Sequence, residues 1–137
     1  MSSSYIPTNL RSQVIERANE LCEYCLIPQS FSFSTHQIDH IIAQKHGGQT
    51  ISENLALSCS ICNKYKGSDI ASIDPQTGII TSLFNPRQDI WEDHFELQVS
   101  GNIHPLTPKG RATARLLQFN QSFRIAERRL LLSPKNS

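Results

Sequence analysis

The N-terminal half of the chain carries one clear helical pattern and several short apolar segments. Between Asn9 and Glu20 the apolar residues return every three or four positions and so share one helix face, which holds Leu10, Val14, Ile15, Ala18 and Leu21. Residues 36–43 hold three isoleucines between turn-forming residues, which predicts a strand. Ser52 is predicted to cap a short helical turn, and Cys59 and Cys62 are expected to lead into a helix that runs through Lys64 to about Ser68.

The C-terminal half alternates short apolar segments with strong turn residues. The predicted elements are a hairpin that turns at residues 74–78 and reaches Phe84, a strand pair at 95–99 and 102–106, a helix that begins at Pro108, and a helix over 122–132. Thr107 and Pro108 are a typical helix start, because the threonine caps free N–H groups and proline suits the first helical position.

The composition is that of an ordinary globular protein, with 38% hydrophobic and 18% charged residues in a chain of 137. No segment approaches the roughly 18 consecutive apolar residues that a membrane span needs. Residues 1–8 lack the charged start and apolar run of a signal peptide. We therefore expect a cytoplasmic protein with no membrane partner.

The net charge of +1 hides an uneven distribution along the chain. The segment 109–137 is strongly basic, whereas acidic residues outnumber basic ones over 1–108. A basic segment can bind phosphates, and it can equally be a solvated helix face. The sequence supports both interpretations.

The four cysteines occur as two Cys-x-x-Cys pairs, Cys22 with Cys25 and Cys59 with Cys62. Each pair offers two thiolates from one tight turn, and two such turns can close on one tetrahedral zinc ion. Disulfides are not expected in a reducing cytoplasm. Four unrelated buried cysteines would not explain the paired spacing, and a thioredoxin-like redox site would need only one pair. The pattern predicts a structural four-cysteine zinc site.

Residues with catalytic potential lie between and directly after these pairs. Asp39 and His40 are adjacent in a predicted strand, Asn54 follows a Gly47-Gly48 loop, and Asn63 comes directly after Cys62. Histidine has the pKa of a general base near neutral pH, and carboxylate and amide oxygens are ligands that Mg²⁺ prefers. An Asp-His dipeptide alone is a weak signal, so the inference rests on the combination.

These residues, in this order and enclosed by the cysteine pairs, resemble the HNH endonuclease family over roughly residues 20–70. The resemblance implies an α+β fold with a zinc-stapled ββα-metal core and metal-dependent hydrolysis of DNA, by nicking or cleavage. A downstream pattern, Leu83 to Arg87 followed by Trp91 and His94-Phe95, looks like the extension of stand-alone bacterial members.

The resemblance also implies a role for each matched residue. His40 is the expected general base, and Asp39 and Asn63 would hold one catalytic Mg²⁺ or Mn²⁺ ion. Asn63 stands where the family commonly has histidine, and its amide oxygen favours hard Mg²⁺. Asn54 would hold the loop by backbone hydrogen bonds and so orient His40. Neighbouring residues of a regular strand point to opposite faces, so the family's distorted strand-to-loop junction is expected at Asp39 and His40.

Three lysines lie near the expected site and are candidates for binding substrate phosphates, namely Lys45, Lys64 and Lys66. Ordinary solvated lysines fit the sequence equally well.

Residues 1–72 are expected to form the nuclease domain with its zinc site, and residues 73–137 a hairpin and two-helix extension packed on that core. The main alternative is a non-catalytic zinc-stabilised module that binds nucleic acid. A second alternative is an HNH nuclease acting on RNA. A binding module has no need of Asp39, His40 and Asn63 together, whereas nothing in the residues separates DNA from RNA. The oligomeric state stays open.

Overall fold

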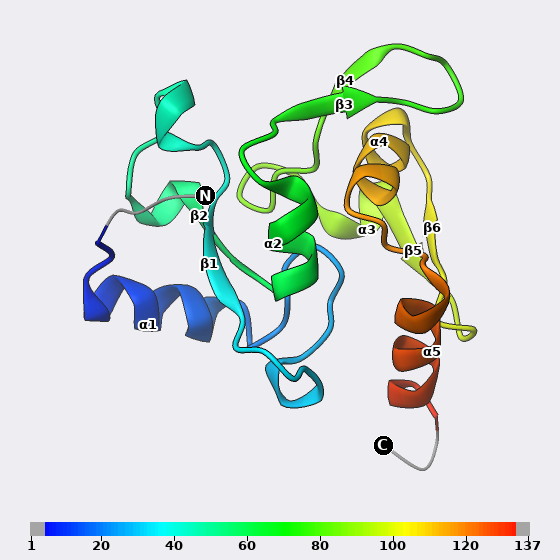
Figure 1. Ribbon diagram of the computed structural model, residues 1–137, viewed down its shortest axis with the longest axis horizontal. Coiled ribbons are helices and arrows are strands. Elements are labelled where there is room, and N and C mark those ends of the chain that lie inside the picture. The colour runs from blue at the N-terminus through cyan, green and yellow to red at the C-terminus, as the bar shows by residue number, and fades with distance from the viewer. Residues whose placement is uncertain (1–4, 134–137) are drawn as a thin grey trace. The chain divides into compact units, whose positions relative to one another are not determined.

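The structure is a computed structural model that describes residues 5–133, and it contains two compact units (Figure 1). The first unit comprises the chain up to Ile70 together with Asn85–Asp89. The second comprises Ala71–Phe84 and the chain from Ile90 onward. Among the described residues no helix has the length and apolar character to cross a membrane.

The first unit has a strand–strand–helix arrangement at its centre. Its elements are α1 (Thr8–Arg17), β1 (Gln37–His40), β2 (Leu55–Ser58) and α2 (Ser60–Lys66), with 3₁₀ turns at Gln29–Phe31, Gln44–His46 and Ser52–Asn54. Strands β1 and β2 are antiparallel, with Gln37 opposite Ser58 and His40 opposite Leu55. Helix α2 follows β2 after one residue, Cys59. This is the ββα order that the resemblance to the HNH family implied (Figure 1).

Helix α1 packs the apolar face predicted from its periodicity against β2. The buried cluster consists of Ile6, Val14, Ala18, Leu55 and Leu57, with Leu10, Ile15 and Ile38 at its border. Full burial of one such aliphatic side chain contributes about 1.5–3 kcal/mol. Arg17, in the last turn of α1, donates to the backbone oxygen of Leu55 at 2.8 Å and thereby joins helix and strand by a polar contact as well.

Two local predictions in this unit were wrong. The strand expected over 36–43 ends at His40, because the backbone of Ile42 is bonded to the Asn54 side chain instead of to a neighbouring strand. The 3₁₀ turn at residues 52–54 has no side-chain cap. The Ser52 hydroxyl accepts hydrogen bonds from Gln13 and Arg17 of α1 instead.

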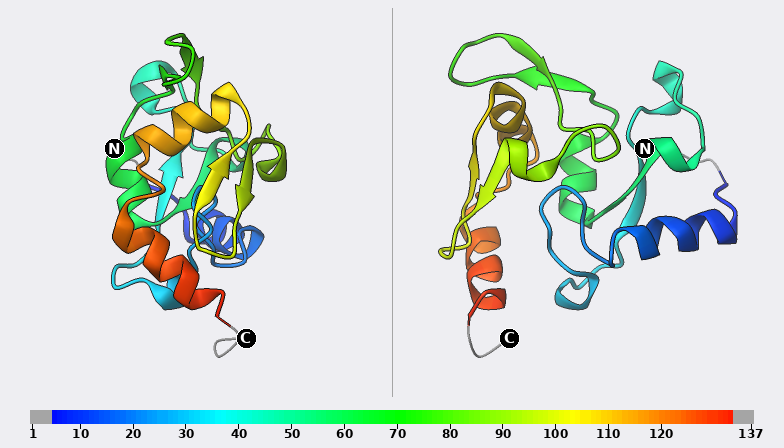
Figure 2. Two further views of the ribbon diagram at one scale, coloured as in Figure 1. Left: turned by 90° about the vertical axis from the view of Figure 1, so that its right-hand side faces the viewer. Right: turned by 180° about the vertical axis from the view of Figure 1, so that it is seen from behind.

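The second unit consists of two hairpins and three helices within the described residues. Its elements are β3 (Ala71–Ile73), β4 (Ile80–Ser82), α3 (Trp91–His94), β5 (Phe95–Leu97), β6 (Ile103–Pro105), α4 (Pro108–Leu116) and α5 (Ser122–Leu131). Both predicted hairpins are confirmed as antiparallel pairs, and β5 and β6 lie side by side in Figure 2. The start of α4 is also confirmed, since the Thr107 hydroxyl accepts the backbone N–H of Gly110 at 3.0 Å.

Aromatic packing and one ion pair hold the second unit together. Phe95 is 1% exposed, and its ring centroid lies 5.5 Å from those of Phe84 and Phe119. Arg111 of α4 forms two hydrogen bonds, of 2.8 and 2.9 Å, with the carboxylate of Asp74 in the β3–β4 turn. These bonds lower the pKa of Asp74 well below its ordinary value. The turn is therefore anchored to α4 by a bidentate contact.

The basic C-terminal segment is partly internal. Arg124 and Arg128 of α5 are 2% and 3% exposed. Arg124 donates to the backbone oxygens of Leu117 and Gln118, at the end of α4, and Arg128 donates to those of Gly101 and Phe119. Neither interpretation of the segment, phosphate binding or a solvated face, holds for these two residues. They satisfy backbone carbonyls that would otherwise be buried without a donor.

Candidate active site and metal centre

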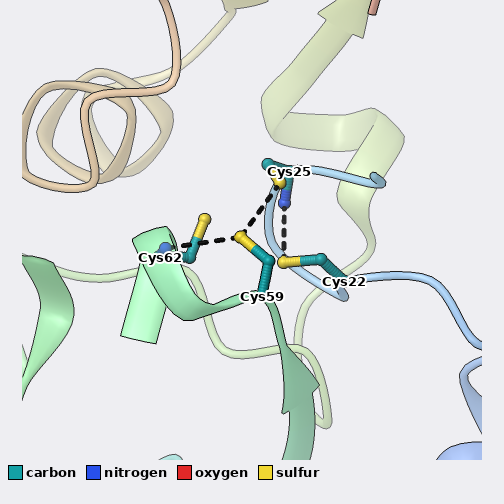
Figure 3. A group of neighbouring side chains, drawn as sticks. All are labelled: Cys22, Cys25, Cys59 and Cys62. Atoms are coloured by element: carbon teal, nitrogen blue, oxygen red, sulfur yellow. Dashed lines mark hydrogen bonds between the residues drawn. The ribbon is translucent and has the colours of Figure 1, made fainter. Parts of the chain in front are cut away.

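The four cysteines of the two pairs meet in the first unit (Figure 3). All four side chains are buried, and their sulfur atoms lie within 4.8 Å of one another. The Sγ atoms of Cys25 and Cys59 are 3.7 Å apart. A tetrahedron of thiolates with zinc–sulfur bonds of about 2.3 Å has sulfur atoms about 3.8 Å apart. The cluster is therefore compatible with a structural zinc ion.

Backbone pairing brings the two cysteine turns together. The N–H of Glu23 donates to the Leu57 carbonyl of β2 at 2.8 Å, and the Leu57 N–H donates back to the Glu23 carboxylate at 2.9 Å. The same carboxylate forms an ion pair with Arg87. Because Leu57 lies two residues before Cys59, these bonds align the first turn with the end of β2. Segment 85–89 thus contributes one residue, Arg87, to the support of the cysteine cluster.

Four thiolates would be unfavourable in this cluster without a cation. Burial raises the pKa of Cys22 and of Cys62, which favours their neutral thiols when no cation is bound, whereas hydrogen bonds from the other thiols lower the pKa of Cys59. Backbone N–H groups of Cys25 and Cys62 donate to the sulfurs of Cys22 and Cys59, each at 3.4 Å. Four thiolates in so small a buried volume repel one another, and a divalent cation offsets that repulsion.

A cavity of about 290 Å³ lies between β1, the loop after it and α2. Its lining includes three of the residues singled out in the sequence as catalytic, Asp39, His40 and Asn63. The remaining lining residues are Gln37, Ile38, Ala43, Gln44, Lys45, Gly67 and Ser68. β1 remains paired with β2 through His40, so the strand-to-loop junction lies directly after the Asp-His pair.

Asp39 is held by two partners that the sequence did not indicate. The Tyr24 hydroxyl donates to its Oδ2 at 2.8 Å, and the Lys66 ammonium lies 3.1 Å from the same oxygen. For Oδ1 the contact with Lys66 is longer, at 3.5 Å. Burial raises the pKa of Asp39, and the charge of Lys66 opposes that shift. The carboxylate is therefore fixed through one oxygen, with the other less engaged.

His40 is 5% exposed, and only one of its ring nitrogens has a hydrogen-bond partner among the described residues. The Nε2 atom lies 2.9 Å from the Thr50 hydroxyl oxygen. The Nδ1 atom is buried and has no hydrogen-bond partner within residues 5–133. Burial lowers the pKa of His40 from its ordinary value, which favours the neutral ring near pH 7. A neutral imidazole with one unpaired nitrogen can accept a proton.

Asn63 begins the second turn of α2 and points its amide toward β1. Its Nδ2 atom donates to Oε1 of Gln37, the first residue of that strand. Since the amide nitrogen is the donor in this bond, the carbonyl oxygen is left as an acceptor. Gln37 and Asp39 are two positions apart on β1 and so share a face. Gln37, Asp39 and Asn63 are all among the residues that line the cavity.

Asn54 holds the loop between β1 and β2 through its side chain. Its Nδ2 atom donates to the backbone oxygens of Ile42 and Gln49, each at 2.9 Å, and its Oδ1 atom accepts the Ile42 N–H at 2.9 Å. Its backbone carbonyl accepts the N–H of Ile41. Gly48 fits beneath this network without a side chain. A Cβ atom at Gly48 would lie 1.7 Å from the Ile42 oxygen.

We expect Gly48→Ala to destabilise the first unit by about 3 kcal/mol, because the new methyl group must displace the Ile42 carbonyl and its bond to Asn54. Urea unfolding measures this loss. Gly47→Ala is the matched control. Gly47 has a φ of +94° but no atom within 4 Å of an added Cβ, so its cost is about 1 kcal/mol of backbone strain. Equal losses in the two variants would contradict the steric explanation.

The three lysines expected near the site have different environments. Lys45 is exposed and lines the cavity. Lys64 is exposed, does not line the cavity, and lies 5.7 Å from the centroid of the Tyr65 ring. Lys66 is 2% exposed, and its ammonium donates to the backbone oxygens of His40 and Ile41 as well as contacting Asp39. A phosphate contact does not fit the position of Lys66.

Sequence reasoning missed four residues that support the site, namely Glu23, Tyr24, Thr50 and Arg87. Each forms a hydrogen bond or ion pair with a residue 10 to 64 positions away in the sequence, so no local pattern marks them. Glu23 and Tyr24 occupy the two variable positions of the first Cys-x-x-Cys pair. Their position between Cys22 and Cys25 was the one feature of the sequence that could have marked them as supporting residues.

Comparison with models of known families matches residues 22–69 to the HNH endonuclease family. Comparisons with curated proteins and with solved structures gave no match. The matched segment holds the four cysteines and every residue that lines the cavity. Residues 22–69 are therefore an HNH endonuclease domain, and this domain suggests nuclease activity for the chain.

Proposed function

We propose that this protein is a metal-dependent endonuclease that hydrolyses phosphodiester bonds in DNA, by nicking or by double-strand cleavage. The observation that carries the proposal is the cavity whose lining residues include Asp39, His40 and Asn63, from two elements of the HNH domain. A module that only binds nucleic acid would not need these three residue types at one cavity. Lys45, at the edge of the same cavity, is the lysine best placed to contact a substrate phosphate.

His40 is the general base in this proposal. Hydrolysis begins when a water molecule loses a proton as it attacks phosphorus, so the base must be neutral and have a free lone pair. The lowered pKa of His40 favours a neutral ring near pH 7, and Nδ1 is the nitrogen without a protein partner among the described residues. Nδ1 is buried in the structure, so the proposal requires that it become accessible to the attacking water when substrate binds. Asn54 positions this histidine indirectly, because it holds the backbone on both sides of the loop that follows His40.

Asp39 and Asn63 are the residues that would hold a catalytic Mg²⁺ or Mn²⁺ ion. The donor set fits a hard cation, because the two residues that line the same cavity carry a carboxylate and an amide. A bound ion would offset the negative charge that develops on the phosphate and on the leaving oxygen. Tyr24 and Lys66 fix the orientation of the Asp39 carboxylate through Oδ2, and Gln37 fixes the amide of Asn63.

The four-cysteine cluster is proposed to hold a structural zinc ion. Its ligands come from the turn at Cys22–Cys25 and from the junction between β2 and α2. Zinc binding would therefore fix α2, which carries Asn63, against the hairpin that carries Asp39 and His40. In this proposal zinc stabilises the fold, and a second metal ion takes part in hydrolysis.

The experiment is to incubate the purified chain with supercoiled plasmid DNA in the presence of Mg²⁺, Mn²⁺ or EDTA. We expect relaxed or linear DNA with either ion and none with EDTA, and adding excess Mg²⁺ after EDTA should restore cleavage while measured zinc content stays unchanged. A single-stranded RNA of similar length is tested in parallel. Cleavage of RNA alone would show that the substrate assignment is wrong. Binding of DNA without cleavage under any ion would support the non-catalytic module.

A further inference from the structure

The hydroxyl group of Thr50 makes the hydrogen bond that orients the His40 ring. Only one of the two ring nitrogens has a hydrogen-bond partner among the described residues. Nε2 lies 2.9 Å from Oγ1 of Thr50, whereas Nδ1 is buried with no partner in the described part of the chain. We infer that Thr50 is a positioning residue that holds His40 in the tautomer with the proton on Nε2 and the lone pair on Nδ1. The effect of Thr50 on catalysis rests on the proposed nuclease function. The tautomer of His40 does not depend on that function.

Two arrangements of protons are compatible with the distance. Nε2–H can donate to the Thr50 oxygen, or the Thr50 hydroxyl can donate to Nε2 while the ring proton sits on Nδ1. In the second arrangement Nδ1–H is a buried donor without an acceptor. Orphaned buried N–H groups are rare in folded proteins, and an acceptor without a donor is tolerated somewhat more often. The first arrangement is favoured for that reason.

Thr50 is itself held in place by the network around Asn54. Asn54 Nδ2 donates to the carbonyl of Gln49, the residue directly before Thr50, and to that of Ile42 at the other end of the loop. The carbonyl of Ile51, directly after Thr50, accepts the backbone N–H of Asn54 at 2.9 Å, so the backbone is bonded on both sides of Thr50. Asn54 acts on His40 through Thr50, and Thr50 makes the direct contact.

The arrangement suits a base that must pick up a proton and release it. When Nδ1 takes a proton, the ring becomes an imidazolium with N–H groups at both nitrogens. Nε2–H remains bonded to the Thr50 oxygen in both charge states, so the ring need not turn during the step. A ring without this bond can flip or change tautomer, and either change removes the lone pair from its working position.

The test compares Thr50→Val with Thr50→Ser. Valine keeps the shape of threonine but has no hydroxyl, whereas serine keeps the hydroxyl. Long-range ¹H–¹⁵N spectra of histidine-labelled protein report which ring nitrogen carries the proton in the neutral ring, and the signals of His40 are assigned by their loss in His40→Gln. We expect the Nε2–H tautomer in the wild type and in Thr50→Ser. In Thr50→Val we expect a mixture of tautomers.

Plasmid nicking gives the second measurement. We expect kcat to fall about tenfold in Thr50→Val with KM changed by less than about twofold, and Thr50→Ser to restore most of the rate. Thr81→Val in β4 makes the same hydroxyl-to-methyl change in the second unit and should leave both measurements unchanged. Zinc content and melting curves verify that each variant is folded.

The outcomes separate this inference from the nuclease proposal. An Nδ1–H tautomer in the wild type, or an unchanged tautomer in folded Thr50→Val, would overturn the role of Thr50 whatever the activity. The expected tautomers in a protein that cuts no nucleic acid would contradict the nuclease proposal and leave the assignment of Thr50 standing.

Discussion

Replacing His40 by alanine is expected to lower the rate of plasmid nicking by about 10²–10⁴-fold, the usual contribution of a positioned general base. His40 is among the residues that line the cavity, and one of its ring nitrogens has no partner among the described residues. Its lowered pKa favours the form that accepts a proton. Alanine removes that acceptor and leaves Asp39 and Asn63 in place. First-order rates of conversion of supercoiled to relaxed DNA measure the effect.

His46→Ala is the matched control for this experiment. His46 lies in the 3₁₀ turn at residues 44–46, is exposed and does not line the cavity. Its removal should leave nicking unchanged. Equal residual cutting by wild type, His40→Ala and a mock purification would point to a contaminating nuclease. Wild-type rates in a folded His40→Ala protein would show that another group takes the proton.

Cys59→Ser is expected to have the largest effect on stability. Cys59 lies between β2 and α2, and its sulfur contacts that of Cys25 from the other turn. Zinc binding supplies folding free energy directly in small metal-stapled domains, so loss of one of four ligands should cost about 3 kcal/mol or more. For a unit of this size that loss lowers Tm by about 15 °C. Zinc content per chain should fall with it.

Elemental analysis and thermal unfolding followed by circular dichroism measure both quantities on the same sample. Ser60→Ala, one position further along α2, is the control and should retain zinc and melt as the wild type does. A Cys59→Ser protein that keeps about one zinc ion per chain with an unchanged Tm would show that the four cysteines are not a zinc site. Re-addition of zinc to chelator-treated wild-type protein should restore the original melting curve.

Elements with strong local signals were predicted well. The apolar spacing in α1, the turn at residues 74–78 and the capping Thr107 each lie within a few positions of the structure they specify. The meeting of the two cysteine pairs was also anticipated, because the paired spacing is a constraint in itself. Strand ends were predicted less well, since β1 ends where the Asn54 side chain binds the backbone of Ile42.

Charged residues were the main source of error. Lys66, at the end of a short helix, and Arg124 and Arg128, spaced four apart, have the pattern of solvated or phosphate-binding side chains. In the structure all three are buried, with Lys66 against Asp39 and the two arginines against backbone carbonyls. Whether a cation is exposed depends on segments far away in the sequence, and periodicity contains no information about them.

By itself, the sequence determined the cysteine pairs and the main turns, because spacing and turn chemistry act over short stretches of chain. Its resemblance to the HNH family implied the ββα order and the candidates Asp39, His40 and Asn63. Only the tertiary structure decided which partners those residues have. The bonds from Tyr24 and Lys66 to Asp39, and from Thr50 to His40, join residues 10 to 27 positions apart. Such contacts form only when buried polar groups from separate elements must find partners inside one core.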